Sequence, residues 1–155
     1  MKKTNAARIL DRHKQSYEMH SYPVDEEDLS VAHVAQSIGV ESHQLFKTLV
    51  TLNEKNHPII AVVSGDKELN LKALAKAAHC KKCTMLPMKE LLKVTGYIRG
   101  GCSPLGMKKQ YPTFIDATIL DHEKIYVSAG VRGLQLKLSP QLLLEVLGAQ
   151  VATLA

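Results

Sequence analysis

The sequence contains no tryptophan, and aromatic residues make up only 5% of it. A protein that binds single-stranded nucleic acid by stacking many bases needs more rings, so that class is disfavoured. Long apolar runs are missing too, because no window approaches the ~20 residues that cross a bilayer. The basic start of the chain is followed at once by Arg8, Asp11 and Arg12, so it is not a signal peptide. We therefore expect a cytoplasmic protein that makes no membrane contact.

Cysteine is scarce as well, with three residues in the chain. An odd number gives no disulfide framework, which suits a reducing compartment. Cys80 and Cys83 have the spacing of a zinc or redox pair, but a structural zinc site needs a second pair and only Cys102 remains. The pair also follows a predicted helix, whereas a thioredoxin-like pair begins one. We expect no metal ion and no cofactor, and the zinc and redox readings stay open as alternatives.

The size and composition of the chain indicate one globular domain, residues 1–155, with 45% hydrophobic and 23% charged residues. No repeat, low-complexity segment or linker divides it. The net charge of +5 favours anionic partners. Many soluble proteins are equally basic without binding nucleic acid, so charge alone does not decide the function.

Hydrophobic periodicity and capping residues predict a mixture of helices and strands. Helices are expected over residues 6–13, from residue 28 or 30 to 38, and over 71–78, 87–93 and 140–147. Strands are expected over 17–22, 45–52, 58–63, 113–116, 125–128 and 134–138, and the turn at 53–56 joins the second and third strands as a hairpin. Since the elements are intermixed without strict alternation, the expected fold class is α/β with a mixed sheet.

The segment Gly100-Gly101-Cys102-Ser103-Pro104-Leu105-Gly106, which we call the glycine loop, is the most informative stretch. Three glycines and a proline in seven residues cannot continue a helix or a central strand. They build a tight loop whose backbone N–H groups can approach a ligand closely. Because Lys108 and Lys109 follow, an anionic partner such as a nucleotide is indicated. The alternative is an ordinary surface turn beside solvated lysines.

Lys47 interrupts a predicted strand that is apolar on both faces. Such a strand is covered on both sides, so the lysine enters the interior or its rim. An unpaired buried cation costs several kcal/mol, so some group must meet it. Either its stem reaches solvent or it pairs with a carboxylate such as Asp116, or it points into a pocket and meets a ligand phosphate.

Four stretches of the chain carry a resemblance to a known family. They are Phe46-Lys47-Thr48-Leu49, Thr95-Gly96-Tyr97 leading into the glycine loop, Pro112-Thr113-Phe114-Ile115-Asp116, and residues 125–134. Together, in this order and spacing, they resemble the YbaK/EbsC family of Cys-tRNA(Pro) deacylases, free-standing relatives of the editing domain of prolyl-tRNA synthetases. The resemblance implies a single α/β domain with a mixed, barrel-like sheet surrounded by helices. It also implies removal of a wrong amino acid, cysteine or alanine, from the 3′ adenosine of tRNA(Pro).

The resemblance also implies site residues. Lys47 is the residue on which activity most depends, and it holds a phosphate or the terminal adenosine. The loop from Gly100 through Cys102 to Pro104 faces the aminoacyl group. The residues implied to line the pocket are Tyr22, Tyr97, Ser128 and Gly130. Two positions depart from the family: Gln135 stands where some relatives have an acidic residue, and Cys102 where relatives often have an aliphatic one.

The chemistry asks little of the protein, because an aminoacyl ester is already activated and needs orientation and oxyanion stabilisation. No convincing Ser-His-Asp or Cys-His arrangement is visible. In the family the substrate cysteine's own thiol is taken to attack its ester carbonyl. We expect the backbone N–H groups of Gly101 to Ser103 to receive the developing charge.

Aminoacyl-tRNA, chiefly tRNA(Pro), is the expected partner, with prolyl-tRNA synthetase as a second candidate and no DNA. Scattered cations are the candidate phosphate contacts: Lys2, Lys3, Lys81, Lys82, Lys108, Lys109, Lys124 and Arg132. Two other functions stay open. One is a non-catalytic module that binds a tRNA 3′ end or a nucleotide, and the other is a structural partner of a synthetase.

Overall fold

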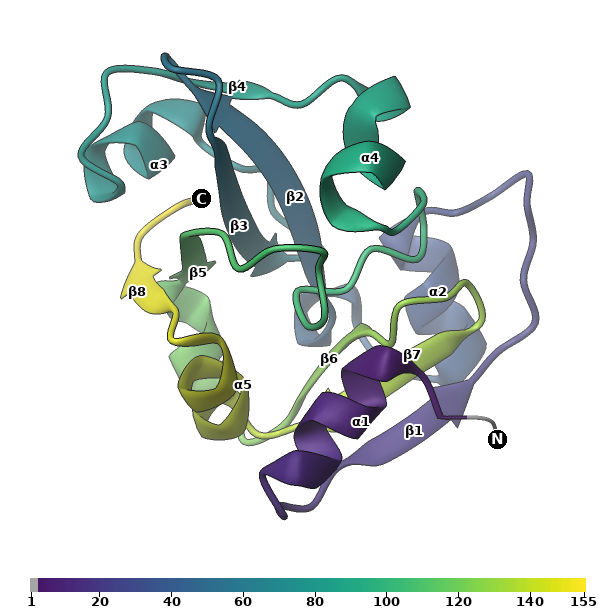
Figure 1. Ribbon diagram of the computed structural model, residues 1–155. Helices are drawn as coiled ribbons and strands as arrows, with labels where there is room; N and C mark the ends of the chain where they lie inside the picture. Colours follow the sequence, from purple (N-terminus) through teal and green to yellow (C-terminus); the bar gives the residue numbers. More distant parts are fainter. Residues whose placement is uncertain (1–2) are drawn as a thin grey trace.

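Two β-sheets and five α-helices form the part of the chain that the computed structural model describes, residues 3–155 (Figure 1). The larger sheet has five strands in the order β4-β2-β3-β5-β8. Its strands are β2 (Phe46–Asn53), β3 (Pro58–Ser64), β4 (Cys83–Met85), β5 (Thr113–Asp116) and β8 (Gln150–Ala152). The β2–β3 hairpin is antiparallel as predicted, and β4 adds an antiparallel strand to β2, whereas β5 and β8 run parallel to β3. The expected mixed sheet is therefore confirmed.

The smaller sheet is antiparallel throughout, in the order β1-β7-β6. Its strands are β1 (Glu18–Ser21), β6 (Ile125–Ser128) and β7 (Leu134–Leu138). One parallel bridge, between Leu45 and Tyr126, connects it to the end of β2. The expected α/β class is confirmed, and within residues 3–155 the strands divide into two sheets that meet at this bridge, with no closed barrel.

The helices begin and end where local side chains satisfy their free backbone groups. They are α1 (Asn5–Arg12), α2 (Val31–Ile38), α3 (Leu71–Ala77), α4 (Leu91–Thr95) and α5 (Pro140–Leu147), with 3-10 turns η1 (Ser42–Gln44), η2 (Met88–Glu90) and η3 (Ala117–Asp121). Ser30, Asn70 and Ser139 each accept a hydrogen bond from a first-turn N–H, as expected of N-cap residues. The predicted helix over 87–93 is instead a 3-10 turn followed by the short helix α4. No helix among the described residues is long and apolar enough to span a membrane.

The main core lies between the two sheets and includes residues of α1 and α5. Side chains alternate along β3, so Ile60 and Val62 enter this core while Ala61 and Val63 face a second cluster with Leu74 of α3. Figure 1 shows α3 and α5 on different sides of the larger sheet. The same alternation applies to β2, whose Phe46 and Val50 point into the main core. Lys47 and Leu49 consequently lie on the α3 face.

Asp116 ties the end of the chain to the larger sheet. Its carboxylate accepts hydrogen bonds from the Leu154 N–H at 2.7 Å and from the Thr118 hydroxyl at 2.7 Å. Burial raises the pKa of this carboxyl, but the hydrogen bonds outweigh burial and lower the pKa below its ordinary value. The carboxylate therefore bonds to η3 and to the segment after β8. The ion pair between Lys47 and Asp116, which the sequence offered as an alternative, does not form among the described residues.

We predict that Gly65→Ala destabilises the fold by about 1–3 kcal/mol, because a Cβ there overpacks a tight junction. That atom would lie 2.3 Å from Val31 Cγ1 and 2.7 Å from the Ser42 carbonyl oxygen. Urea unfolding of Gly65→Ala, Val31→Ala and the double variant measures the effect. Since removing the valine branch relieves the closer clash, the double variant should lose less stability than the sum of the single losses. Strictly additive losses would contradict this explanation.

Candidate functional site

The edge of β2 that faces away from β3 is paired only at its two ends. At one end, Thr51 to Asn53 pair with β4, and the Leu86 N–H donates to the Val50 carbonyl at 3.0 Å. At the other end, Leu45 bridges to Tyr126 of β6. Between these points, residues 47–49 have no strand partner on this edge among the described residues.

The backbone of Thr48 faces this open edge. In an antiparallel strand, successive residues direct their N–H and C=O groups to opposite sides. The Val50 carbonyl is directed toward β4, as its bond from Leu86 shows. Thr48, two residues earlier, therefore presents its N–H and C=O to the same side. These groups can bond a ligand that lies along the strand.

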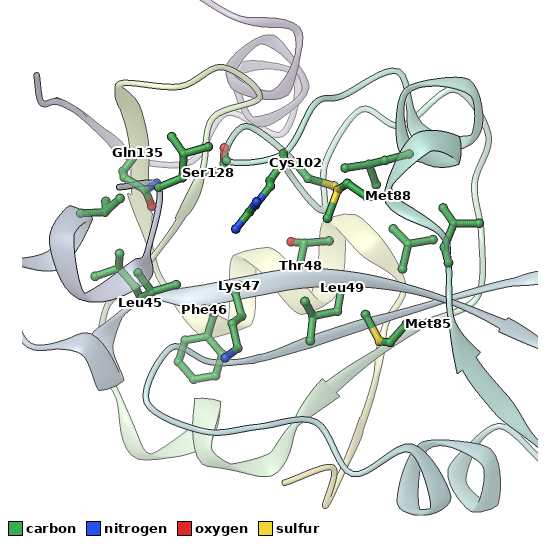
Figure 2. A pocket seen from close by; sticks show the side chains of 18 residues that line it. Leu45, Phe46, Lys47, Thr48, Leu49, Met85, Met88, Cys102, Ser128 and Gln135 are labelled. Carbon is green, nitrogen blue, oxygen red and sulfur yellow. The ribbon is translucent and has the colours of Figure 1, made fainter. Parts of the chain in front are cut away.

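A cavity of about 260 Å³ covers the open edge (Figure 2). Its walls come from four parts of the chain: the start of α2, the segment from β4 to α4, the glycine loop with Arg99 before it, and the smaller sheet. The residues outside β2 that line it are Leu29, Val31, Val34, Leu45, Met85, Leu86, Met88, Leu91, Arg99, Gly100, Cys102, Ser128 and Gln135. Most of these walls are apolar, so the few polar groups among them determine which ligand is oriented there.

The permanent charges in the lining are both positive. Lys47 and Arg99 line the cavity, whereas its lining residues include no aspartate, glutamate or histidine. Lys47 is half-buried and makes no ion pair with a carboxylate of residues 3–155. Gln135, buried at the wall, is neutral. The electrostatics of the cavity thus favour an anionic ligand.

Lys47 and Thr48 reach different sides of the open edge. Figure 2 shows Thr48 on the side of β2 that faces Cys102, whereas the Lys47 amine points away from Cys102. This follows from the alternation along β2. A ligand that touches both must cross the strand edge, with its negatively charged part near Lys47.

The Thr48 hydroxyl is buried and has no hydrogen-bond partner among the described residues. A buried hydroxyl without a partner costs about 1–3 kcal/mol, so native proteins rarely leave one unsatisfied. Thr48 lines the cavity, so its buried hydroxyl lies at the wall of the space that a ligand would occupy. This polar group distinguishes the middle of the cavity from its apolar walls.

The glycine loop is held against the segment that follows β6. The Arg132 Nε donates to the Arg99 carbonyl at 2.8 Å, across 33 positions of sequence. A Cβ on Gly101 would lie 3.2 Å from the Arg132 backbone nitrogen, which is shorter than nearly all contacts that Cβ atoms make in proteins. Gly100 adopts a φ of +83°, which L side chains rarely adopt. Both glycines are therefore needed for the loop to approach this segment.

The structure brings four of the predicted site residues to the cavity: Lys47, Gly100, Cys102 and Ser128. The Ser128 hydroxyl accepts a hydrogen bond from the Gly130 N–H at 3.2 Å. Burial raises the pKa of the Cys102 thiol to about 11, and a hydrogen bond with Thr95 opposes that rise only in part.

The other predicted site residues lie outside the cavity lining. The Gly101 N–H already donates to the Ile98 carbonyl at 2.9 Å. Ser103 is fully buried, and its hydroxyl accepts from the Leu105 N–H at 3.2 Å, which shapes the turn. Pro104 borders a separate cavity. Their expected roles toward an aminoacyl group stay predictions.

The two predicted pocket tyrosines support neighbouring segments. The Tyr97 hydroxyl donates to the Leu105 carbonyl, and its ring lies where a Cβ on Gly130 would be 3.0 Å away. Burial and the nearby Cys102 raise the pKa of Tyr97 to about 12. Tyr22 packs with the cluster around α2, and its N–H donates to the Gly133 carbonyl at 2.9 Å.

Sequence reasoning missed several lining residues, of which Thr48 and Arg99 carry polar groups. Arg99 directly precedes the glycine loop, so its sequence position was a usable signal. Thr48 belongs to the stretch Phe46-Lys47-Thr48-Leu49 that carries the resemblance, but nothing in the sequence marked its hydroxyl as a site group, because a threonine in a β-strand is ordinary. Its importance depends on an open strand edge that a single strand pattern does not show.

The predicted phosphate-binding cations have different surroundings. Lys3 pairs with Asp11 at 2.7 Å, and Arg132 is bonded to the Arg99 carbonyl beside the cavity. The side chain of Lys108 lies 3.3 Å from where a Cβ on Gly96 would be. Lys2 lies outside the described residues.

Comparisons with known proteins agree with this description. The Enterococcus faecalis protein named "Putative Cys-tRNA(Pro)/Cys-tRNA(Cys) deacylase EbsC" is 47% identical over 150 residues, which covers 97% of this chain and 92% of that protein. A proline–tRNA ligase of Geotalea daltonii is 31% identical over 111 residues, 72% of this chain but 19% of that enzyme. The crystal structure of the hypothetical protein APE2540 superposes with a TM-score of 0.89 and 25% identity, covering 97% of this chain and 99% of that one.

The family model described as an aminoacyl-tRNA editing domain matches residues 25–146, which include every lining residue of the cavity. This range is most of the chain. The protein therefore belongs to the aminoacyl-tRNA editing domain family, as its sequence motifs predicted.

Proposed function

We propose that the protein is an aminoacyl-tRNA deacylase that removes cysteine from tRNA(Pro), with the aminoacylated 3′ end bound across the open edge of β2. The observation that carries the proposal is that Lys47 and Thr48, whose hydroxyl has no hydrogen-bond partner among the described residues, border one cavity with no acidic side chain in its lining. The Enterococcus faecalis relative, whose name specifies Cys-tRNA(Pro) and Cys-tRNA(Cys), supports the substrate class.

The anionic part of the substrate is assigned to Lys47. A lysine ammonium is a compact charge that binds phosphate without the planar geometry that arginine requires. Since no described carboxylate pairs with it, its charge is not already neutralised. Arg99 adds a second cation on the glycine-loop side. The acceptor end of a tRNA supplies phosphates next to the terminal adenosine, which suits this pair.

The aminoacyl part is assigned to the side of β2 that holds Thr48, Cys102 and Ser128. Apolar walls there suit a small side chain, and Thr48 offers a hydroxyl and backbone groups to the ester and the amino acid. An apolar pocket in a synthetase excludes smaller guests weakly, by ~1–3 kcal/mol per missing methylene. A separate site that hydrolyses such products is the physical reason for editing.

The protein supplies no nucleophile in this proposal. The Cys102 thiol stays protonated at neutral pH, and the cavity lining holds no histidine or carboxylate to activate Ser128. The substrate cysteine's thiol attacks its own ester carbonyl, forming a cyclic thioester. The freed tRNA hydroxyl takes up the proton that the thiol loses.

The oxyanion contact is assigned to the Cys102 amide. Among the N–H groups expected for this task, that of Gly101 is already bonded to Ile98, whereas Cys102 lines the cavity. The Cys102 N–H has no acceptor among the described residues. A preorganised amide aimed at developing charge lowers the barrier without reorganisation.

We also propose a cytoplasmic location and a functional association with prolyl-tRNA synthetase. Lysine and arginine contacts to phosphates carry no sequence information, so the selection of tRNA(Pro) needs a second component that recognises its bases. The presence of a related segment within a proline–tRNA ligase is consistent with that division of labour.

Replacing the cavity lysine tests the function. We expect Lys47→Ala to slow deacylation of Cys-tRNA(Pro) by about 10- to 100-fold, the loss for one hydrogen bond to a charged group. The measurement is release of labelled cysteine from Cys-tRNA(Pro), with Ala-tRNA(Pro) and Cys-tRNA(Cys) assayed in parallel. The control is Lys76→Ala, an exposed lysine on α3, which should match the wild-type rate. Equal, slow release by the wild type and Lys47→Ala would instead indicate a non-catalytic tRNA-end binder.

The state of the Cys102 thiol gives a second test. Because burial raises its pKa to about 11, it reacts as a thiolate only at high pH. In the folded protein, alkylation of Cys102 by iodoacetamide should therefore keep rising between pH 8 and pH 10, as measured by peptide mass spectrometry. In urea the same residue should react faster and level off near its ordinary pKa. Rapid alkylation of folded Cys102 at pH 7 would contradict the assignment of no protein nucleophile.

A further inference from the structure

The turn between α3 and β4 brings two thiols into contact at a place separate from the cavity lining. The Sγ atoms of Cys80 and Cys83 lie 3.4 Å apart. Cys80 is partly exposed, whereas Cys83 is buried at 6% exposure. The aminoacyl-tRNA chemistry proposed above uses neither residue.

The end of α3 fixes the position of Cys80. The Cys80 N–H donates to the Ala75 carbonyl at 3.0 Å, and the His79 N–H donates to the Lys76 carbonyl at 3.2 Å. His79 has a φ of +56°, so these bonds form a Schellman motif with a histidine in the left-handed position. The backbone at Cys80 is thereby held in one direction.

The larger sheet fixes the position of Cys83. Cys83 pairs with Asn53 in the β2–β4 ladder, and its side chain packs in the cluster beneath α3. Between the two cysteines, the Lys81 N–H donates to the Glu54 carboxylate at 3.0 Å. The turn is therefore anchored at both ends and in its middle, so the contact of the thiols is built into the fold.

We propose that Cys80 and Cys83 form a reversible redox modification site, in which a low-molecular-weight disulfide oxidises the pair to an intramolecular disulfide. The more exposed Cys80 attacks first: its thiolate bonds to one sulfur of the oxidant and displaces one thiolate. Cys83 then loses its proton, bonds to the Cys80 sulfur and displaces the second thiolate. Two protein thiols and one small disulfide thus become one protein disulfide and two small thiols.

The surroundings of the pair support this order of events. Burial, followed by the contact with Cys80, raises the pKa of Cys83 to about 11, so Cys83 suits the resolving role better than the attacking one. A zinc site is the weaker reading, because it needs four ligands and no third metal-binding side chain of residues 3–155 joins the pair.

The test treats the folded, reduced wild-type protein with excess oxidised glutathione and follows thiol content and mass. We expect two of the three thiols to be lost, with a mass decrease of two hydrogen atoms and a peptide linking Cys80 to Cys83. Dithiothreitol should restore both thiols. Cys102→Ser is the matched control and should form the same disulfide.

Single variants separate the two roles. Cys83→Ser should retain one glutathione on Cys80, because the resolving thiol is gone, whereas Cys80→Ser should react more slowly and form no internal bond. A stable glutathione adduct on the wild type, a link that includes Cys102, or no reaction of the pair would overturn the proposal. Phenylarsine oxide, which needs two adjacent thiols, gives an independent readout on the wild type and should protect Cys80 and Cys83 from alkylation. None of these measurements involves tRNA, so their failure leaves the deacylase assignment unaffected.

Discussion

The site depends on a β-strand that is only partly paired along one edge. Unpaired backbone groups in a protein interior are costly, and most strands satisfy them with a neighbour. On this edge of β2 the partner changes from β4 to β6 along the strand, and among the described residues neither strand pairs with residues 47–49. The walls of the cavity then rise around this interval. The unpaired backbone of β2 at the base of the cavity is therefore a consequence of the way the two sheets meet at the start of β2.

This arrangement places a charged side chain and a neutral polar side chain on opposite faces of β2 within one cavity. Alternation along β2 puts Lys47 on the face toward α3 and Thr48 on the face toward the main core, yet both border the same cavity. A charged group and a reacting ester can thus be held separately, although the residues that hold them are adjacent in sequence. The contact between the glycine loop and residues 131–132 closes the second side.

Stability and function draw on different parts of the fold. The hydrophobic clusters are packed mainly with aliphatic side chains, and helix caps, turns and the Asp116 anchor satisfy polar groups around them. Among the described residues, the cavity instead retains a hydroxyl without a hydrogen-bond partner and two cations without an ion-pair partner. Sites of ligand binding commonly keep such unfavourable features, because the ligand supplies the missing partners. The thiol pair at Cys80 and Cys83 belongs to neither category, since it lies in a turn that is rigid but not needed by the proposed deacylation.

Elements that depend on neighbouring residues were readable from the sequence. Ser30, Asn70 and Ser139 begin their helices, and the turn after Asn53 joins two strands, because capping and turn formation involve residues close in the chain. The strands β4 and β8 were not predicted. Each has three residues and exists because a distant strand offers it an edge.

The same distinction applies to the candidate site. Lys47 and the glycine loop were recognisable because a cation in an apolar strand and a cluster of glycines are unusual in the sequence itself. Only the coordinates show that Gly101 and Ser103 use their polar groups in hydrogen bonds within the loop region. They also show that the Thr48 hydroxyl has no hydrogen-bond partner among the described residues. The amino-acid order by itself determined the family, the α/β class and the local starts and stops. Only the tertiary structure decided which strand edge stays open, since edge pairing is a competition among segments far apart in the chain.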